Sequence, residues 1–183
     1  MRSRGAAVSD ERAQDAEACR EAALKLLERT RRTRADLGRK LRQKGYQAQV
    51  VSAVIERLGG VGLLDDSEYA RAFLDERWGR RAAGWRRLEQ ELRRRGVAGD
   101  DIARARAAFE QERGGTDEVR LARRVIVQAE RRYAALEPRV RRQRLYGLLV
   151  RRGFESETID QALNAPDTND ASSFSATNDE EAT

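Results

Sequence analysis

The side chains that could carry out catalysis are few in this sequence. It contains no histidine and a single cysteine, which excludes an imidazole base, a Ser–His or Cys–His pair, and an internal disulfide. A zinc site would have one soft ligand at most. The cysteine, Cys19, lies next to Arg20 in a segment with a helical pattern, which favours a small packing residue over a nucleophile. We therefore expect no enzymatic activity, no metal and no cofactor.

Two further motifs contain residue types that occur in active sites. Asp65 and Asp66 form a pair of carboxylates, but acids adjacent in sequence are better explained as caps of the helix that follows. The stretch Gly59-Gly60-Val61-Gly62 is rich in glycine. A phosphate-binding loop would need a following Lys-Ser or Lys-Thr and a preceding strand, and both are missing here. We interpret this stretch as a flexible connector.

With catalysis set aside, positive charge is the property of the sequence that indicates a function. The chain has 37 Lys and Arg against 31 Asp and Glu, a net charge of +6. Residues 165–183 hold five acids and no base, so the rest of the chain carries +11 once these five negative charges are set aside. A body of this charge attracts polyanions or an acidic protein surface. Composition alone leaves open the alternative that the arginines reflect a genome rich in G and C.

An internal repeat organises the elements that carry this charge. The pattern Leu-x-x-x-Leu-x-x-x-Gly, followed by an apolar residue, occurs three times. The copies are Leu37, Leu41, Gly45 and Tyr46; Leu88, Leu92, Gly96 and Val97; and Leu145, Leu149, Gly153 and Phe154. Leucines four apart lie on one face of a helix, and glycine at the C′ position allows a left-handed turn after which the apolar residue packs back. Each copy therefore predicts a helix, a glycine turn and another helix.

One more amphipathic segment precedes each copy, so the repeat unit has three helices. We expect first helices at 14–29, 67–79 and 117–133, second helices at 33–44, 84–95 and 138–152, and third helices at 47–58, 97–113 and 155–163. Helix start signals agree with these boundaries. The candidate N-caps are Thr33 and Asp100, with several candidates each in Asp65-Asp66-Ser67-Glu68 and Thr116-Asp117-Glu118, and Pro138 suits the first position of its helix.

The composition favours an elongated body over one large core, because charged residues make up 37% of the chain and aromatic residues 5%. We predict an all-α fold, an elongated array of three tandem three-helix repeats of helix-turn-helix-like form. The repeats span 14–64, 65–115 and 116–164. The segments 1–13 and 165–183 are predicted to be disordered tails, the second of them acidic.

The positive charge is concentrated at the same position in every repeat. The second helices carry net charges of +4, +3 and +6, whereas the third helices carry 0, −1 and −3. Genome composition alone does not produce this segregation. If the units stack, the second helices could form a discontinuous basic band along the array. The alternative is a solvated face whose arginines pair with nearby acids.

The residue types in the band favour contacts with charge over sequence reading. Cations give salt-dependent affinity for phosphates in any sequence, whereas base reading needs a more mixed helix surface. Stacking on single strands needs exposed aromatic side chains. Trp78 and Trp85, on either side of the Gly79-to-Gly84 loop, are the aromatic residues outside core-like positions, and we favour packing as their role.

The sequence also resembles a known family, bacterial RecX. The residues that carry the resemblance are Gly62-Leu-Leu-Asp-Asp-Ser-Glu-Tyr-Ala-Arg-Ala-Phe-Leu-Asp-Glu-Arg77, Leu88-Glu-Gln-Glu-Leu-Arg-Arg-Arg-Gly96 and Thr33-Arg-Ala-Asp-Leu-Gly-Arg-Lys-Leu-Arg-Gln-Lys-Gly-Tyr46. The resemblance covers residues 18–164; it departs in the Trp78-to-Trp85 connector, and both tails are extra. It implies tandem three-helix repeats that lodge in the groove of the RecA filament on single-stranded DNA. It further implies inhibition of the RecA ATPase and of strand exchange, and a place in DNA repair, recombination and the SOS response.

Together the charge pattern and the resemblance suggest that the second helices face the filament groove and meet RecA acids or DNA phosphates. The residues assigned to this contact are Lys40, Arg42, Lys44, Arg86, Arg87, Arg93, Arg94, Arg95, Arg151 and Arg152.

Two other functions remain open. The protein could be a general DNA-binding protein without sequence preference, acting on single-stranded or double-stranded DNA, or a helical scaffold with no nucleic-acid role. The sequence shows no apolar run of signal-peptide or membrane-span length, so we expect a cytoplasmic protein with no membrane partner. We also expect it to be a monomer.

Overall fold

The computed structural model describes residues 13–78 and 82–164. The predicted tails lie outside the described residues, apart from Ala13, which is buried and whose carbonyl accepts a hydrogen bond from the N–H of Gln47 at 3.0 Å. The described residues form helices and no strand. The helices are α2 (Ala16–Arg29), α3 (Arg34–Gln43), α4 (Ala48–Gly60), α5 (Asp66–Arg77), α6 (Trp85–Arg94), α7 (Gly99–Glu112), α8 (Glu118–Tyr133), α9 (Pro138–Arg151) and α10 (Ser156–Asn164).

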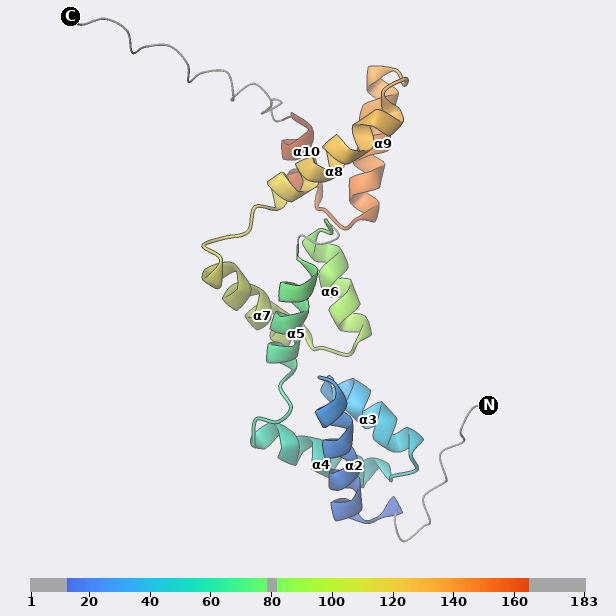
Figure 1. The fold of residues 1–183 in the computed structure, drawn as a ribbon, viewed down its shortest axis with the longest axis vertical. Helices are drawn as coiled ribbons and strands as arrows, with labels where there is room; N and C mark the ends of the chain where they lie inside the picture. The colour runs from blue at the N-terminus through green and yellow to red at the C-terminus, as the bar shows by residue number, and fades with distance from the viewer. Residues whose placement is uncertain (1–12, 79–81, 165–183) are drawn as a thin grey trace, which may run out of the picture.

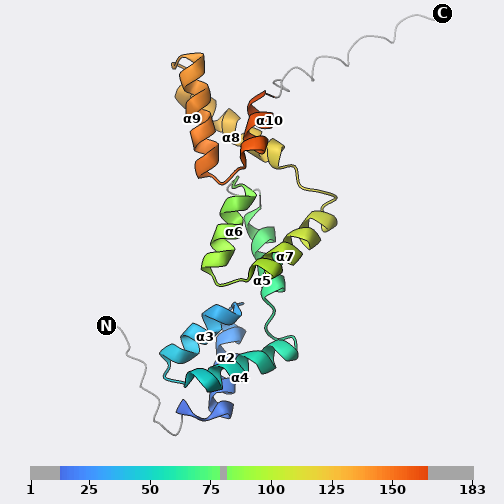
Figure 2. The ribbon, with the colours of Figure 1, turned by 180° about the vertical axis from the view of Figure 1, so that it is seen from behind.

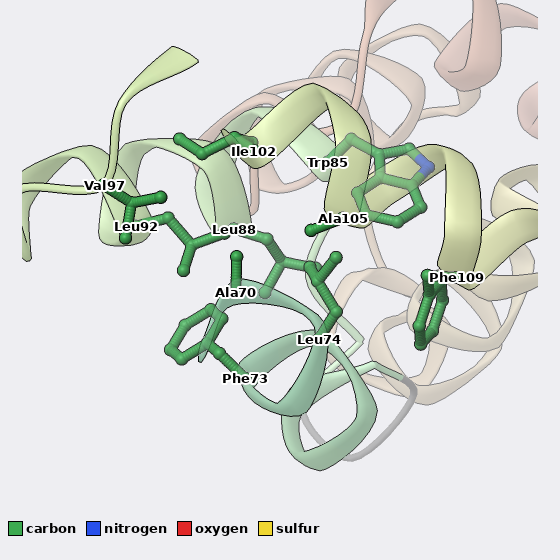
Figure 3. Packing of buried hydrophobic residues seen from close by; sticks show 10 residues of the cluster. All are labelled: Ala70, Phe73, Leu74, Trp85, Leu88, Leu92, Val97, Ile102, Ala105 and Phe109. Carbon is green, nitrogen blue, oxygen red and sulfur yellow. The ribbon is translucent and has the colours of Figure 1, made fainter. Parts of the chain in front are cut away.

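The helices group into three units, each with a core of its own. Unit 1 is formed by α2, α3 and α4, unit 2 by α5, α6 and α7, and unit 3 by α8, α9 and α10. Each unit buries a separate cluster of apolar side chains. In unit 2 the repeat leucines Leu88 and Leu92 pack with Phe73 of α5 and Ile102 of α7 (Figure 3). The prediction of an all-α array of three-helix repeats is confirmed.

The glycine turns of the repeat have the predicted geometry. Gly45, Gly96 and Gly153 have φ values of 97°, 83° and 84°. In each unit the N–H of the apolar residue after the glycine donates to the carbonyl of the second repeat leucine, at 3.3, 3.2 and 3.2 Å. This bond is the signature of a Schellman motif, and the apolar residue is buried each time. A local pattern of three residue types therefore sets the turn between second and third helices.

Side-chain caps begin the helices at most of the predicted positions. Thr33 accepts a backbone N–H at the start of α3, Asp65 accepts two at the start of α5, and Asp117 accepts one at the start of α8. Pro138 is the first residue of α9, where its missing N–H removes no intrahelical bond.

Two local predictions were wrong. Asp100 is not a cap, because α7 begins one residue earlier and has no side-chain cap; Asp100 lies in the first turn, where its charge still suits the helix dipole. The glycine-rich connector is largely helical, since α4 continues through Gly59 and Gly60 and the chain turns at Gly62, with φ of 74°. Gly59 lies against the guanidinium of Arg34, which would have to shift to admit a side chain there.

The units stack end to end along the long axis of the molecule. Figure 1 shows α3, α6 and α9 on one side of the array and α4, α7 and α10 on the other. The view from behind shows the same three helices along the opposite edge of the picture, as expected for one side of the array (Figure 2). The fold therefore places the three basic second helices on one side of an elongated body.

Candidate functional site

The candidate site is the exposed side of α3, α6 and α9, which we call the basic face. It comprises the ten residues assigned from the sequence, which belong to these helices or to their C-caps, and the three helices lie on one side of the array (Figures 1 and 2). Eight of the ten are exposed, and Lys40 and Arg152 are half-buried.

Two hydrogen bonds to carbonyl groups at helix ends, one from a side chain and one from the backbone, hold the three helices end to end. The hydroxyl of Thr33, which caps α3, donates to the carbonyl of Arg95 at the end of α6, at 2.7 Å. The N–H of Gly84, before α6, donates to the carbonyl of Arg152 at the end of α9, at 2.9 Å. We call these two contacts between consecutive units the joints. In both joints the negative end of one helix dipole meets the positive end of the next.

Glycines permit the close approach at these joints. A Cβ on Gly96 would overlap the Cβ of Ala35 in unit 1, and one on Gly153 would overlap the backbone of Arg87 in unit 2. A Cβ on Gly84 would overlap the carbonyl oxygen of Gly153. Gly96 and Gly153 therefore serve both the turn within a unit and the contact between units.

Six cations of the basic face are available to a partner. These are exposed and make no ion pair with any described residue: Arg42, Lys44, Arg86, Arg93, Arg94 and Arg151. They come from all three second helices. The alternative of a face neutralised by its own acids does not hold for these six side chains.

Two other predicted residues are engaged within unit 2. Arg87 pairs with Glu91 at 3.4 Å. The guanidinium of Arg95 donates to the hydroxyl of Tyr69 at 2.9 Å and lies 5.2 Å from the ring centroid of Phe73. Substitution of Arg95 would therefore disturb the packing of unit 2 as well as the charge of the face.

Lys40 and Arg152 are the half-buried members of the face. Lys40 is one of the cations that stabilise the ionised carboxyl of Asp36. Partial burial raises the pKa of Asp36, but the hydrogen bond from Arg32 and the charges of Lys40, Arg32 and Arg39 outweigh this effect, so the pKa is lowered. Arg152 contributes its carbonyl to the joint with Gly84. Both residues therefore have structural roles besides any contact with a partner.

The acids of α6 pair with arginines of neighbouring helices, and Glu91 also pairs with Arg87 of the basic face. Glu89 pairs with Arg106 of α7 at 3.6 Å, and Glu91 pairs with Arg77 of α5 at 3.4 Å. Both acids are half-buried between helices. The exposed side of α6 is thus more basic than its net charge suggests.

The remaining reactive residue types are in packing positions. Trp78 and Trp85 stack with centroids 4.4 Å apart, and Trp78 contacts the cores of units 2 and 3, as the packing interpretation predicts. No aromatic side chain in the described part of the chain is fully exposed. Cys19 is completely buried in unit 1, and burial raises the pKa of its thiol to about 11, which disfavours a thiolate nucleophile.

Sequence reasoning missed two carboxylates between the units, Asp66 and Glu118. Asp66 is 5% exposed, and burial raises its pKa despite the hydrogen bond it accepts from the N–H of Arg34. Glu118 is half-buried, and burial raises its pKa despite hydrogen bonds from the N–H of Trp85 and the hydroxyl of Thr158. In the sequence each of them directly follows the acid that caps the helix, and this position is also typical of capping residues, so the pattern did not distinguish the two roles.

Other kinds of site are not found in residues 13–78 and 82–164. This part of the chain holds no group of three or more acid, cysteine or histidine side chains arranged to bind a metal ion. None of its helices combines the length and apolarity needed to cross a membrane.

Family models match each of the three units. The first, second and third three-helix domains of RecX match residues 19–58, 65–105 and 116–163. A "Regulatory protein RecX" of Thermobifida fusca is 39% identical over 136 residues, which cover 73% of this chain and 70% of that protein. Another of the same name, from Halorhodospira halophila, is 38% identical over 156 residues, covering 84% and 91%.

Solved structures show the same fold. The crystal structure of RecX from Lactobacillus salivarius superposes with a TM-score of 0.73 at 21% identity, covering 81% of this chain and 94% of that one. A second crystal structure of a regulatory protein RecX gives a TM-score of 0.72 at 24% identity, covering 82% and 73%.

Proposed function

Because the chain belongs to the RecX family of regulatory proteins, we propose that it binds the RecA filament on single-stranded DNA and restrains its ATPase and strand-exchange activities. The basic face is the contact surface in this proposal. Its cations meet acidic groups of RecA or phosphates of the DNA. The protein thereby regulates DNA repair and recombination.

The observation that supports this proposal is the set of six exposed, unpaired cations distributed over α3, α6 and α9. Each cation that meets a phosphate or carboxylate adds a charge-assisted contact. Because the helices are held end to end, contacts made by one unit raise the effective concentration of the next. An extended partner with repeated negative charge, such as a nucleoprotein filament, suits this arrangement better than a compact one.

A general DNA-binding protein is the second candidate, because the same cations would bind naked DNA. Such binding would be salt-dependent and indifferent to sequence. The absence of exposed aromatic side chains among the described residues argues against stacking on single-stranded bases. The two functions differ in the concentration at which the protein acts.

The first experiment compares filament and free DNA in one buffer. RecA is assembled on single-stranded DNA with ATP, the protein is added at substoichiometric amounts, and ATP hydrolysis is followed. A titration of bare DNA runs in parallel. We expect hydrolysis to fall at protein concentrations well below those that coat free DNA. Loss of hydrolysis only when the DNA itself is saturated would favour the general DNA-binding protein.

A charge-reversal pair then tests the basic face. Arg93→Glu with Arg94→Glu should raise the concentration for half-maximal inhibition by about tenfold or more, since it reverses two unpaired cations at the centre of the face. Arg95 is left unchanged because it packs on Phe73 and binds Tyr69.

The matched control reverses two arginines of the third helices, Arg57→Glu with Arg104→Glu. Both side chains are exposed, and the change in net charge is the same, although Arg104 also loses its exposed ion pair with Asp101. We expect a much smaller effect, because these residues lie on the other side of the array. Equal losses for the two pairs would mean that net charge, and not the basic face, governs inhibition.

A further inference from the structure

Two carboxylates occupy equivalent places between the units. Asp66 is the first residue of α5, and its Oδ1 accepts the N–H of Arg34, the first residue of α3, at 2.8 Å. Glu118 is the first residue of α8, and its Oε1 accepts the N–H of Trp85, the first residue of α6, at 2.8 Å. Units 2 and 3 thus each present a carboxylate to the start of the second helix in the unit before.

These carboxylates are not needed to begin their own helices. Asp65 caps α5 by accepting the N–H groups of two first-turn residues, and Asp117 caps α8 in the same way with one. Asp66 and Glu118 make their described backbone hydrogen bonds to the neighbouring unit. Burial of a carboxylate is unfavourable unless it accepts hydrogen bonds, so the position of each unit relative to the next is tied to these bonds.

At each joint, the later unit therefore places two hydrogen-bond acceptors at the start of the second helix of the preceding unit. One acceptor is the carboxylate, and the other is the carbonyl at the end of the following second helix, Arg95 or Arg152. The free N–H groups of a helix start are directional donors. Each carboxylate accepts such an N–H. The carbonyl accepts the hydroxyl of Thr33 in one joint and the N–H of Gly84 in the other. Together the two bonds restrict both the distance and the angle between consecutive second helices.

We propose that Asp66 and Glu118 are positioning residues that fix the spacing and direction of α3, α6 and α9, so that the basic face acts as one multivalent surface. The identity of the partner rests on the proposed function, whereas the placement of the three helices by these carboxylates is independent of it. Without the carboxylates the cations remain on their helices, but the three helices engage a regular, extended polyanion independently. Affinity then falls because the second and third contacts lose their high effective concentration.

The experiment measures the distances between second helices in the full chain. Pairs of spin labels are attached at exposed, uncharged positions through Gln43→Cys with Gln90→Cys, and Gln90→Cys with Gln143→Cys. Cys19 is fully buried, and the chain without added cysteines checks that it takes no label. The distance distribution of each pair is recorded by pulsed electron spin resonance without a partner.

The variants remove or keep the acceptor. Asp66→Ala should broaden the α3–α6 distribution and leave the α6–α9 distribution unchanged, and Glu118→Ala should do the reverse. Asp66→Asn and Glu118→Gln keep a carbonyl acceptor and should retain the narrow distributions of the parent. Asp100→Ala is the matched control, because it removes an exposed first-turn acid that is not in a joint. Alanine distributions that superimpose on the parent would overturn the proposal.

A variant on the donor side keeps the test decisive if an alanine variant folds poorly. Arg34→Pro removes the N–H that Asp66 accepts, and proline is well tolerated at the first position of a helix. Circular dichroism should show an unchanged helix content while the α3–α6 distribution broadens. A narrow distribution in this variant contradicts the assignment to Asp66.

The same variants are then added to the RecA filament. We expect the concentration for half-maximal inhibition to rise about tenfold or more for the alanine variants and to stay near the parent value for Asn and Gln. Broadened distances with unchanged inhibition would overturn the positioning role. A parent that leaves the filament unaffected contradicts the proposed function alone, and the distances still decide whether the carboxylates fix the helices.

Discussion

At the residue scale, adjacent acids have different tasks depending on which N–H groups they face. Asp65 accepts from its own helix, whereas Asp66 accepts from α3 in the preceding unit. Asp117 and Glu118 repeat this division between α8 and α6. The first acid of each pair stabilises a helix start, and the second joins two units. A pair of acids that resembles a catalytic motif in the sequence is thus a structural device.

The joint carboxylates predict an unusual pH dependence. Burial raises the pKa of Asp66 above 3.8 and that of Glu118 above 4.5. The folded protein therefore holds these protons to higher pH than the unfolded chain does. The contribution of the two carboxyl groups to the free energy of unfolding is therefore greatest at low pH, and it falls as the pH rises through their raised pKa values. The Asp66→Asn, Glu118→Gln variant lacks this titration, so its stability relative to the parent should increase over that range in urea unfolding experiments.

The charged groups around the two carboxylates set the background for this measurement. Those facing Asp66 are Arg34, Asp65 and Asp101, and those facing Glu118 are Arg106 and Glu155. Asp36→Asn is the control of opposite sign, because the pKa of Asp36 is lowered and its contribution is lost as the pH falls. A stability difference between parent and double variant that does not change with pH would contradict the prediction.

At the scale of the elements, the close contact of Gly96 with Ala35 predicts a coupled pair of substitutions. Gly96→Ala combines a positive φ of 83° with an overlap against the Cβ of Ala35. We expect a loss of about 2–4 kcal/mol in the free energy of unfolding, from the left-handed backbone and the overpacking together. Gly114→Ala, with φ of 65° and nothing within 4 Å, should lose only about 1–2 kcal/mol.

A double-mutant cycle separates the two causes. Adding Ala35→Gly to Gly96→Ala removes the overlapping atom and should recover the overpacking part, so that the two substitutions are coupled by about 1–3 kcal/mol. Urea unfolding of the four proteins in the cycle measures the coupling. Additive losses would mean that the joint relaxes freely around Gly96.

The contrast between turns and joints explains how far the sequence predicts this structure. The turn at Gly45 and the cap at Thr33 depend on residues within one turn of a helix, so their pattern is local and the prediction was correct. The contact of Asp66 with Arg34 spans 32 residues and depends on how two units meet. The helices that carry the ten basic-face residues follow from the repeat pattern, whereas the engagement of Arg95 by Tyr69 follows from packing that spacing does not encode.

A comparison of the three units would have disclosed the joints. Asp15, Asp65 and Asp117 cap the first helices, and the next residue is Ala16, Asp66 and Glu118 in turn. The extra acid occurs in the two units that follow another three-helix unit. In unit 1, which has none before it among the described residues, alanine takes its place.

At the scale of the whole molecule, charge is sorted across the long axis. The second-helix segments carry +4, +3 and +6 on one side of the array, and the third-helix segments carry 0, −1 and −3 on the other. A chain with a net charge of only +6 thereby presents a strongly basic face. Because opposite charges on the far side weaken non-specific attraction from that direction, orientation toward a polyanion is favoured along with affinity.

The two outer units differ from the joints in ways that oppose further stacking. α9 has 14 residues, whereas α3 and α6 have 10 each, so the start of α9 extends one turn beyond the place where a following unit would dock. Its first residue is Pro138, which has no N–H for an incoming carboxylate. At the other end, Ala16 supplies no carboxylate to the second helix of a preceding unit.

Head-to-tail association of two molecules through a copy of these joints would therefore lack both partners of the carboxylate bond, the N–H donor and the carboxylate acceptor. Self-association by such a heterologous contact would otherwise produce open filaments. We expect a monomer whose sedimentation coefficient does not change from micromolar to near-millimolar concentration in analytical ultracentrifugation. Growth of species with concentration would show that the array continues between molecules by a different contact, and the basic face would then extend along the assembly instead of ending after three second helices.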